Sequence, residues 1–258
     1  MSSPRIIISN SNHNCNICGR YAKKLSEDHV PPKCTGNNGQ TIMYAYSDDS
    51  ISPLRRNKGV TYQTICRDCN NLLGHSYDNE FGKFCKYIKA IIESPLTYPY
   101  PHTLIEINPL KLAKSILGHL LATMVNHTLL NNKYNENIQN FILGKEDLLP
   151  CIKIYYWVFP YKTYISANNI IGHSMANITN NNLYHILKLY PIAFAIIYET
   201  KPCNARYLLN ELTQYFNNTT SVKLNLPTEP FPYNFPEKAQ DFCNLRQDNH
   251  NDTISFKP

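Results

Sequence analysis

Two pairs of cysteines with the same internal spacing constrain this 258-residue chain more than any other feature. Cys15 and Cys18 form one C-x-x-C pair, Cys66 and Cys69 form the other, and 47 residues lie between the two pairs. Each pair can place two thiolates on one turn, and two such pairs can close a tetrahedral site around zinc. Gly19 follows the first pair and allows the tight turn of a zinc knuckle. We therefore expect one structural zinc ion held by four cysteines.

The remaining composition favours an intracellular protein with a polyanionic partner. The sequence has no run of about 18 apolar residues, and the apolar stretch at residues 6–8 is too short for a signal peptide. We expect a cytoplasmic location, where paired cysteines indicate metal ligands before disulfides. The net charge is +6, and residues 1–93 carry twelve basic and eight acidic side chains, a net charge of +4. This balance suits nucleic acid as a partner.

The first 95 residues show the pattern of a hairpin followed by a long helix. Residues 25–30 and 60–65 are expected to form two strands, with a polar, turn-rich loop over residues 34–58 between them. A helix is expected over residues 68–93, because apolar side chains recur there at steps of three and four. These side chains are Leu73, Tyr77, Phe81, Phe84, Ile88 and Ile91. Three prolines between residues 95 and 101 mark the predicted end of this domain.

Residues 96–258 are expected to form a second domain of mixed α/β structure that selects the target or the partner. Helices are predicted over residues 110–130, 137–144 and 205–216, and strands over residues 151–159, 161–165, 184–189 and 193–199. The first two of these strands are expected to pair around Pro160. Proline and asparagine dominate the end of the chain, so roughly the last 25 residues are expected to be partly disordered.

A short charged element lies between the two cysteine pairs. It reads Ser26-Glu27-Asp28-His29-Val30-Pro31-Pro32-Lys33 and ends the first predicted strand. At such a position Asp28 and His29 point either to opposite faces of the strand or lie side by side at its end. One of them can then hold a metal ion while the other faces a water molecule. Asn70 and Asn71 directly follow the second cysteine pair.

In order and spacing, these elements resemble the HNH endonuclease superfamily, and most of all its bacterial subgroup with a structural zinc. The resemblance rests on Cys15-Asn16-Ile17-Cys18, on Asp28-His29-Val30-Pro31-Pro32-Lys33 and on Cys66-Arg67-Asp68-Cys69-Asn70-Asn71. It implies an α+β fold in which a ββα-metal (treble-clef) HNH domain in residues 1–95 precedes the mixed α/β domain of residues 96–258. It also implies metal-dependent hydrolysis of nucleic acid, above all DNA, in restriction or phage defence.

The resemblance gives three residues a catalytic role. His29 matches the general base, since a neutral imidazole can accept a proton near neutral pH. Asp28 and Asn70 match the oxygen ligands of a catalytic Mg2+ or Mn2+ ion that binds the scissile phosphate. The middle Asn of the signature has no counterpart, because Thr61 and Tyr62 occupy its usual place before Cys66.

Helix geometry and charge suggest what surrounds this site. At about 100° per residue, Asn70 lies on the apolar side of the predicted helix and faces the hairpin. Asn71, His75 and Asp78 share another face that we expect to be solvated, and a polar cluster or a DNA contact is the alternative. His119 and the other histidines of the second region show no ligand spacing and are expected to be structural. The candidate phosphate contacts are Lys33, Arg55, Arg56 and Lys58.

Two other interpretations stay open at this point. A non-catalytic zinc module that binds DNA or protein needs only the cysteines, and it leaves Asp28 and His29 unexplained. Alternatively, the larger C-terminal part docks a partner while the HNH part is degenerate. The missing middle Asn is compatible with both, and metal-dependent nicking of a plasmid would separate them from the nuclease hypothesis.

Overall fold

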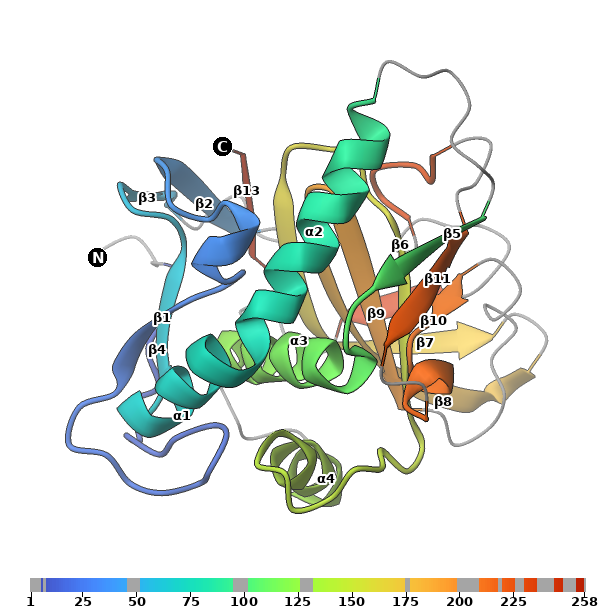
Figure 1. Ribbon diagram of the computed structural model, residues 1–258. Coiled ribbons are helices and arrows are strands. Elements are labelled where there is room, and N and C mark those ends of the chain that lie inside the picture. Colours follow the sequence, from blue (N-terminus) through green and yellow to red (C-terminus); the bar gives the residue numbers. More distant parts are fainter. Residues whose placement is uncertain are drawn as a thin grey trace.

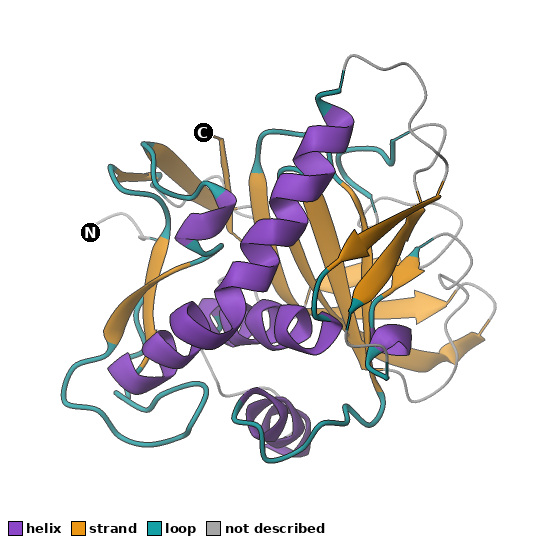
Figure 2. Cartoon of the chain, viewed as in Figure 1, coloured by secondary structure: helices purple, strands orange, loops and turns teal. Residues whose placement is uncertain are grey.

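The computed structural model describes residues 6, 8–45, 52–94, 102–125, 132–174, 177–198, 209–217, 220–225, 230–235, 244–247 and 254–257. Within this part the chain has a mixed α/β fold. Figure 1 and Figure 2 show two long helices, α2 and α3, lying against one face of a large sheet, with a separate small hairpin beside them.

The small hairpin and the helix after it follow the sequence-based expectation closely. Strand β1 (Ser26–His29) pairs antiparallel with β4 (Thr61–Ile65), and His29 lies opposite Thr61. Helix α1 (Arg67–Leu72), a π-helical turn (Leu73–Tyr77) and α2 (Asp78–Ile92) then form an almost continuous rod. Four members of the predicted apolar stripe are fully buried: Leu73, Phe81, Phe84 and Ile88.

The segment between β1 and β4 is more structured than expected. It contains a short 3-10 turn, η1 (Lys33–Thr35), and two strands, β2 (Thr41–Ala45) and β3 (Leu54–Arg56). The prediction of a plain loop over residues 34–58 was therefore wrong. Strand β2 pairs with β3 from the same segment and with β13 near the C-terminus, and the second, long-range pairing leaves little trace in a polar local sequence.

Nine strands form the large sheet, in the order β10-β6-β9-β8-β7-β13-β2-β3, with β12 also paired to β7. Every pairing in it is antiparallel. Its remaining members are β6 (Ile152–Val158), β7 (Tyr164–Ser174), β8 (Asn177–Leu189), β9 (Ile192–Tyr198), β10 (Asn210–Glu211), β12 (Asn244–Gln247) and β13 (Ile254–Lys257). Strands β5 (His102–Glu106) and β11 (Ser221–Asn225) form a separate antiparallel ribbon.

The sheet joins the two halves of the chain. Strand β13, close to the C-terminus, pairs with β2 on one side and with β7 on the other. One apolar core also contains side chains from both halves, among them Val30, Phe84, Leu117 and Tyr156. The boundary expected at residue 95 therefore does not separate two independently packed units in the described part of the chain.

Helix α3 (Pro109–Thr123) lies between the hairpin and the large sheet and is buried over nearly its whole length. Its N-cap, Asn108, accepts a hydrogen bond from the backbone of Lys111, and Pro109 follows as the first helical residue. Helix α4 (Asn132–Ile142) and the short turn η5 (Thr213–Tyr215) both contact α3. Rings of α2 pack edge-on against the sheet, with Phe84 5.6 Å from Tyr156.

Several predictions for the second half need correction. Strand β6 pairs with β9 and β10, and β7 pairs with β8, so the two strands flanking Pro160 do not pair with each other. Residues 210–215 form β10 and η5 in place of the predicted helix, whose residues 205–208 lie outside the described residues. Within the end of the chain, which is expected to be partly disordered, the described residues 244–247 and 254–257 form β12 and β13, and this prediction is not contradicted. In the residues described, no helix has the length and apolar character needed to span a bilayer.

Candidate metal centre and catalytic site

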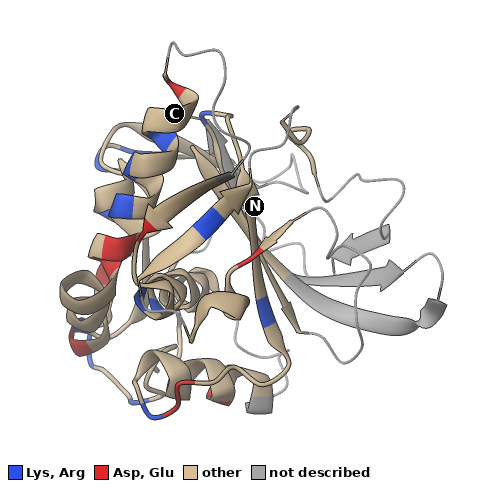
Figure 3. Cartoon of the chain, turned by 45° about the vertical axis from the view of Figure 1, so that its right-hand side comes forward, with Lys and Arg blue, Asp and Glu red and all other residues tan. Residues whose placement is uncertain are grey.

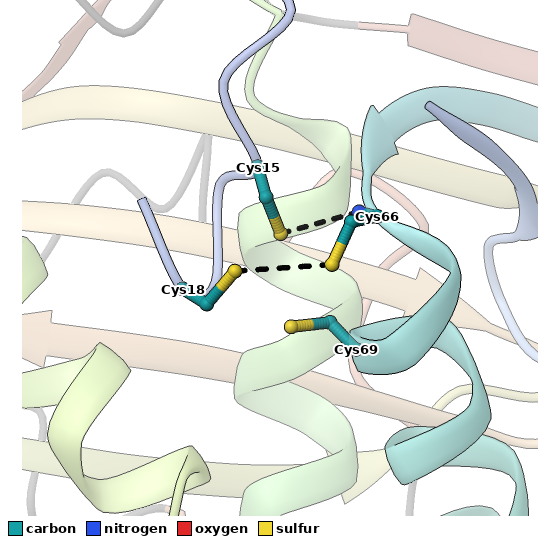
Figure 4. Close-up of side chains that lie close together, drawn as sticks. All are labelled: Cys15, Cys18, Cys66 and Cys69. Atoms are coloured by element: carbon teal, nitrogen blue, oxygen red, sulfur yellow. Dashed lines mark hydrogen bonds between the residues drawn. The ribbon is translucent and has the colours of Figure 1, made fainter. Parts of the chain in front are cut away.

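The four paired cysteines converge at the end of the small hairpin (Figure 4). Their four Sγ atoms all lie within 4.8 Å of one another, and the Cys18 and Cys66 sulfurs are 3.8 Å apart. A tetrahedron with zinc–sulfur bonds of about 2.3 Å has edges of about 3.8 Å. This geometry confirms a four-cysteine cluster that can hold a metal ion such as zinc.

Two of the four sulfurs accept hydrogen bonds from nearby N–H groups. The backbone N–H of Cys66 donates to Cys15 Sγ at 3.2 Å, and Arg20 Nε donates to Cys18 Sγ at 3.5 Å. A hydrogen bond with Cys69 lowers the pKa of Cys15 to about 4, whereas burial raises the pKa of Cys66. Gathering several thiolates in a partly buried site is costly without a counter-charge, and a divalent cation would supply one.

The cluster is tied to the C-terminal end of α3 through buried polar groups. Asn16, inside the first cysteine pair, donates from Nδ2 to the carbonyl oxygens of Leu121 (2.8 Å) and Met124 (2.7 Å). Thr64 Oγ1 donates to the carbonyl of Ala122 at 2.7 Å. These bonds engage carbonyls at the C-terminal end of α3, where the regular hydrogen bonding of a helix ends and Leu121 otherwise accepts only from the Met124 N–H at 3.2 Å. The metal cluster and α3 therefore hold each other in place.

His29 ends strand β1 with its imidazole half-buried. Its Nε2 lies 2.9 Å from the carbonyl oxygen of Lys58. A carbonyl can only accept a hydrogen bond, so Nε2 carries the proton and Nδ1 keeps its lone pair in the neutral ring. Burial lowers the pKa of His29 below its ordinary value of 6.5, which favours that neutral form.

Asp28 points away from His29, because neighbouring residues of a strand face opposite sides. Its side chain is only 5% exposed, and Oδ2 lies 3.2 Å from Nδ1 of His119 on α3. On its other side His119 Nε2 lies 2.9 Å from Asp78 Oδ1, which also accepts a hydrogen bond from Ser115. Burial alone would lower the pKa of His119, but the two carboxylates raise it to about 10, so the ring is an imidazolium at neutral pH.

This buried charge network corrects one expectation. Asp78 was expected on a solvated helix face together with Asn71 and His75. Asn71 and His75 are exposed, but the Asp78 side chain is only 15% exposed and bonded to His119. Because α3 covers this side of α2, a face that would be solvated in an isolated helix becomes part of the interior.

Asn70 faces the hairpin, as its position on the helix predicted. Its Nδ2 donates to Ser26 Oγ at 2.8 Å and to the carbonyl of Glu27 at 3.2 Å. Both amide donors of Asn70 are therefore directed at β1, and Oδ1 is the atom through which this residue would bind a cation. Glu27 lies on the outer face of β1 and accepts a hydrogen bond from Thr61 Oγ1 at 2.8 Å.

A buried asparagine that sequence reasoning missed braces the loop after His29. Asn37 Nδ2 donates to the carbonyls of Pro31 (2.6 Å) and Val60 (3.0 Å), and its Oδ1 accepts from the Val60 N–H at 2.8 Å. Gly59 lies directly against it, since a Cβ on Gly59 would approach the carbonyl oxygen of Asn37 to 2.5 Å. Asn37 therefore holds together the loop after His29 and the segment around Val60, which follows Lys58. The sequence alone did not indicate which residue would do this.

The candidate phosphate contacts lie at different places in the fold. Lys33 is exposed in η1, close enough to His29 for its charge to help lower the pKa of the imidazole. Arg55 is exposed and Arg56 half-buried on β3, the edge strand of the large sheet. Lys58 is exposed and contributes its carbonyl to His29.

No protein-family model, curated protein or solved structure matches the chain. Conclusions about function therefore rest on the residues themselves. Among the residues described, only the four cysteines form a cluster of three or more His, Cys, Asp and Glu side chains with converging ligand atoms. A catalytic divalent ion beside His29 would have to rely on fewer such side chains, supplemented by Asn70, water and substrate oxygens.

Proposed function

We propose that the chain is a metal-dependent nuclease of the HNH type, in which His29 is the general base and the ββα unit of β1, β4 and α1 is held by a structural zinc. The observation that carries the proposal is the bond between His29 Nε2 and the Lys58 carbonyl at 2.9 Å. It selects the tautomer in which Nδ1 can accept a proton, as hydrolysis of a phosphodiester requires of a base.

The residues around His29 fit this role. The imidazole ends β1, and its lowered pKa keeps it unprotonated at neutral pH. Asn37 braces the loop on each side of the imidazole, which limits the ways in which it can move. Asn70 reaches from α1 to Ser26 and Glu27 of β1, so its amide oxygen lies at the strand that His29 ends.

A catalytic Mg2+ or Mn2+ ion would neutralise charge on the scissile phosphate and on the leaving oxygen. Asn70 and Asp28 are the proposed protein ligands. Asp28 would have to bind through Oδ1, because Oδ2 faces His119, and would do so from the face of β1 opposite His29. Glu27, on the outer face of the same strand as His29, is the other carboxylate within the element. Parallel measurements on Asp28→Asn and Glu27→Gln distinguish them, because the true ligand's variant needs more Mn2+ for half-maximal cleavage.

The test of the nuclease itself uses purified wild type and His29→Ala on supercoiled plasmid, with and without Mg2+ or Mn2+. Wild type should nick or cut the plasmid only with added metal, and His29→Ala should be slower by about 10²–10⁴-fold. The variant should keep its zinc content, its melting temperature and its affinity for DNA, because His29 binds none of the cysteines. A wild-type protein without metal-dependent cleavage would leave the non-catalytic zinc module as the better description.

A further inference from the structure

A groove runs along α2 from Asn79 to Glu93. It consists of two adjoining hollows of about 340 Å³ and 520 Å³. The walls are η1 with the loop that follows it, α2, and the turns between β6 and β7 and between β8 and β9. Both hollows share Thr35, Gly36, Lys89 and Tyr190, so they form one continuous feature, which we call the α2 groove.

Lysines outnumber carboxylates in the lining of the α2 groove. Four lysines and a single carboxylate, that of Glu93, line it. The lysines are Lys83, Lys86, Lys89 and Lys162. Three of them recur at steps of three along α2 and stay within about 120° of its circumference. The recurrence of basic residues along this helix is visible in Figure 3.

Half of this positive charge has no acidic counterpart nearby. Lys83 pairs with Glu80 at 2.8 Å, and Lys89 lies 3.9 Å from Glu93. In the part of the chain that the structure describes, no ion pair involves Lys86 or Lys162. Unpaired cations along a hollow raise the local concentration of anions.

The other walls offer neutral hydrogen-bonding groups. The loop after η1 contributes Asn38 and Gln40, β2 contributes Thr41, and the turn after β6 contributes Thr163. Lysine ammonium groups among neutral polar side chains are the typical contacts of nucleic-acid phosphates and sugars. A hollow lined in this way suits a phosphate-bearing chain better than an apolar helix or peptide.

The α2 groove begins at the candidate catalytic element. Pro31, two residues after His29, lines it, and so does Asn37, which braces the loop beside His29. The groove therefore adjoins the segment that follows His29, and a strand whose phosphate lay at His29 could extend toward it. We propose that the α2 groove binds the sugar–phosphate backbone of the DNA whose cleavage is proposed above, through Lys86, Lys162 and their neighbours. This inference rests on the proposed nuclease function for the identity of its ligand.

The salt dependence of binding tests this proposal without cleavage. His29→Ala protein, with its zinc retained, is titrated with a labelled DNA duplex at salt concentrations between about 50 and 200 mM. Each phosphate contact that is lost should reduce the slope of log K against log salt by about 0.9. Adding Lys86→Gln and Lys162→Gln should therefore reduce the slope by about 1.8. Adding Glu93→Gln alone should strengthen binding.

A matched control replaces two lysines outside the groove, Lys145→Gln and Lys223→Gln, in the same His29→Ala background. This pair removes the same net charge and should leave the slope unchanged. If the slope fell equally in both double variants, only net charge would matter and the proposal would be overturned. An unchanged slope in the groove variant would overturn it too, and so would a His29→Ala protein that binds no DNA. The cleavage assay tests the nuclease proposal separately. If wild type bound DNA through Lys86 and Lys162 but did not cut it, the nuclease proposal would be refuted and the α2 groove would still be a DNA-binding surface.

Discussion

His119 and Asp28 lie 91 residues apart in the sequence, yet Nδ1 of His119 lies 3.2 Å from Oδ2 of Asp28 in the interior. Asp78 completes the bridge on the far side of the imidazole ring. The strand that carries His29 is thereby linked to α2 and α3 through one fully buried cation. Stability and the geometry of the candidate site should both depend on it.

Replacement of His119 tests that dependence. His119→Ala leaves two carboxylates without their shared cation, and removing one partner of a buried pair typically costs about 3–5 kcal/mol. Chemical denaturation should show a loss of that order. His75→Ala, which removes an exposed imidazole three residues from Asp78, is the control and should change stability little. Equal stability of the two variants would mean that the bridge contributes nothing.

Gly59 is the residue on which the bracing by Asn37 depends. Its φ of +84° is unfavourable for any side chain, and a Cβ there would collide with Asn37. Gly59→Ala should lower the melting temperature and slow cleavage, since both segments that contact His29 would have to shift. Gly39→Ala is the matched control, because its Cβ would meet nothing within 4 Å. Cleavage by Gly59→Ala at the wild-type rate would show that the loop position is not needed.

The metal cluster gives a prediction about folding. Cys69→Ser removes one of four converging sulfurs, so the protein should lose its bound zinc and the cooperative melting of the hairpin. The control, Cys151→Ser, changes an exposed cysteine outside the cluster. Elemental analysis and thermal melting on the same preparations measure both effects. Well-folded wild-type protein without any bound metal would contradict the assignment.

The sequence was sufficient for these cysteines, for β1 and β4, and for the long helix, because each depends on local spacing. It was also sufficient for the direction of Asn70, which follows from helical geometry alone. The pairing of β13 with β2 could not be foreseen, since the two strands lie some two hundred residues apart and neither carries a distinctive pattern. The shared apolar core could not be foreseen either, because its side chains come from both sides of the domain boundary expected at residue 95.

The sequence around His119 contains a weak indication that this residue is buried among polar partners. Ser115, His119 and Thr123 recur at steps of four within a helix that is otherwise mostly apolar, so they form a polar stripe on a buried element. A buried polar stripe requires partners, but the sequence does not say which ones. The identity of Asp28 and Asp78 as those partners, and of Asn37 as the brace, depends on packing between distant segments.

The last prediction concerns Glu80, which joins α2 to the start of α3. Its Oε1 accepts a hydrogen bond from Lys83 Nζ at 2.8 Å, and Oε2 accepts one from the Asn108 N–H at 2.9 Å, with the side chain only 12% exposed. Burial by itself would raise the pKa of this carboxyl, but the bonds to Lys83 and Asn108 outweigh burial and leave the pKa below its ordinary value of 4.5.

A lowered pKa means that the folded protein binds this proton less tightly than the unfolded chain does. The stabilisation by Glu80 is therefore fully present above about pH 4.5 and is lost as the pH falls through the lowered pKa. Glu80→Gln should melt below wild type at neutral pH, and the difference should shrink in acid. Glu146→Gln, at an exposed carboxyl, should show no such trend. A melting difference between Glu80→Gln and wild type that stayed constant from neutral pH into acid would mean that the charge of Glu80 does not stabilise the fold.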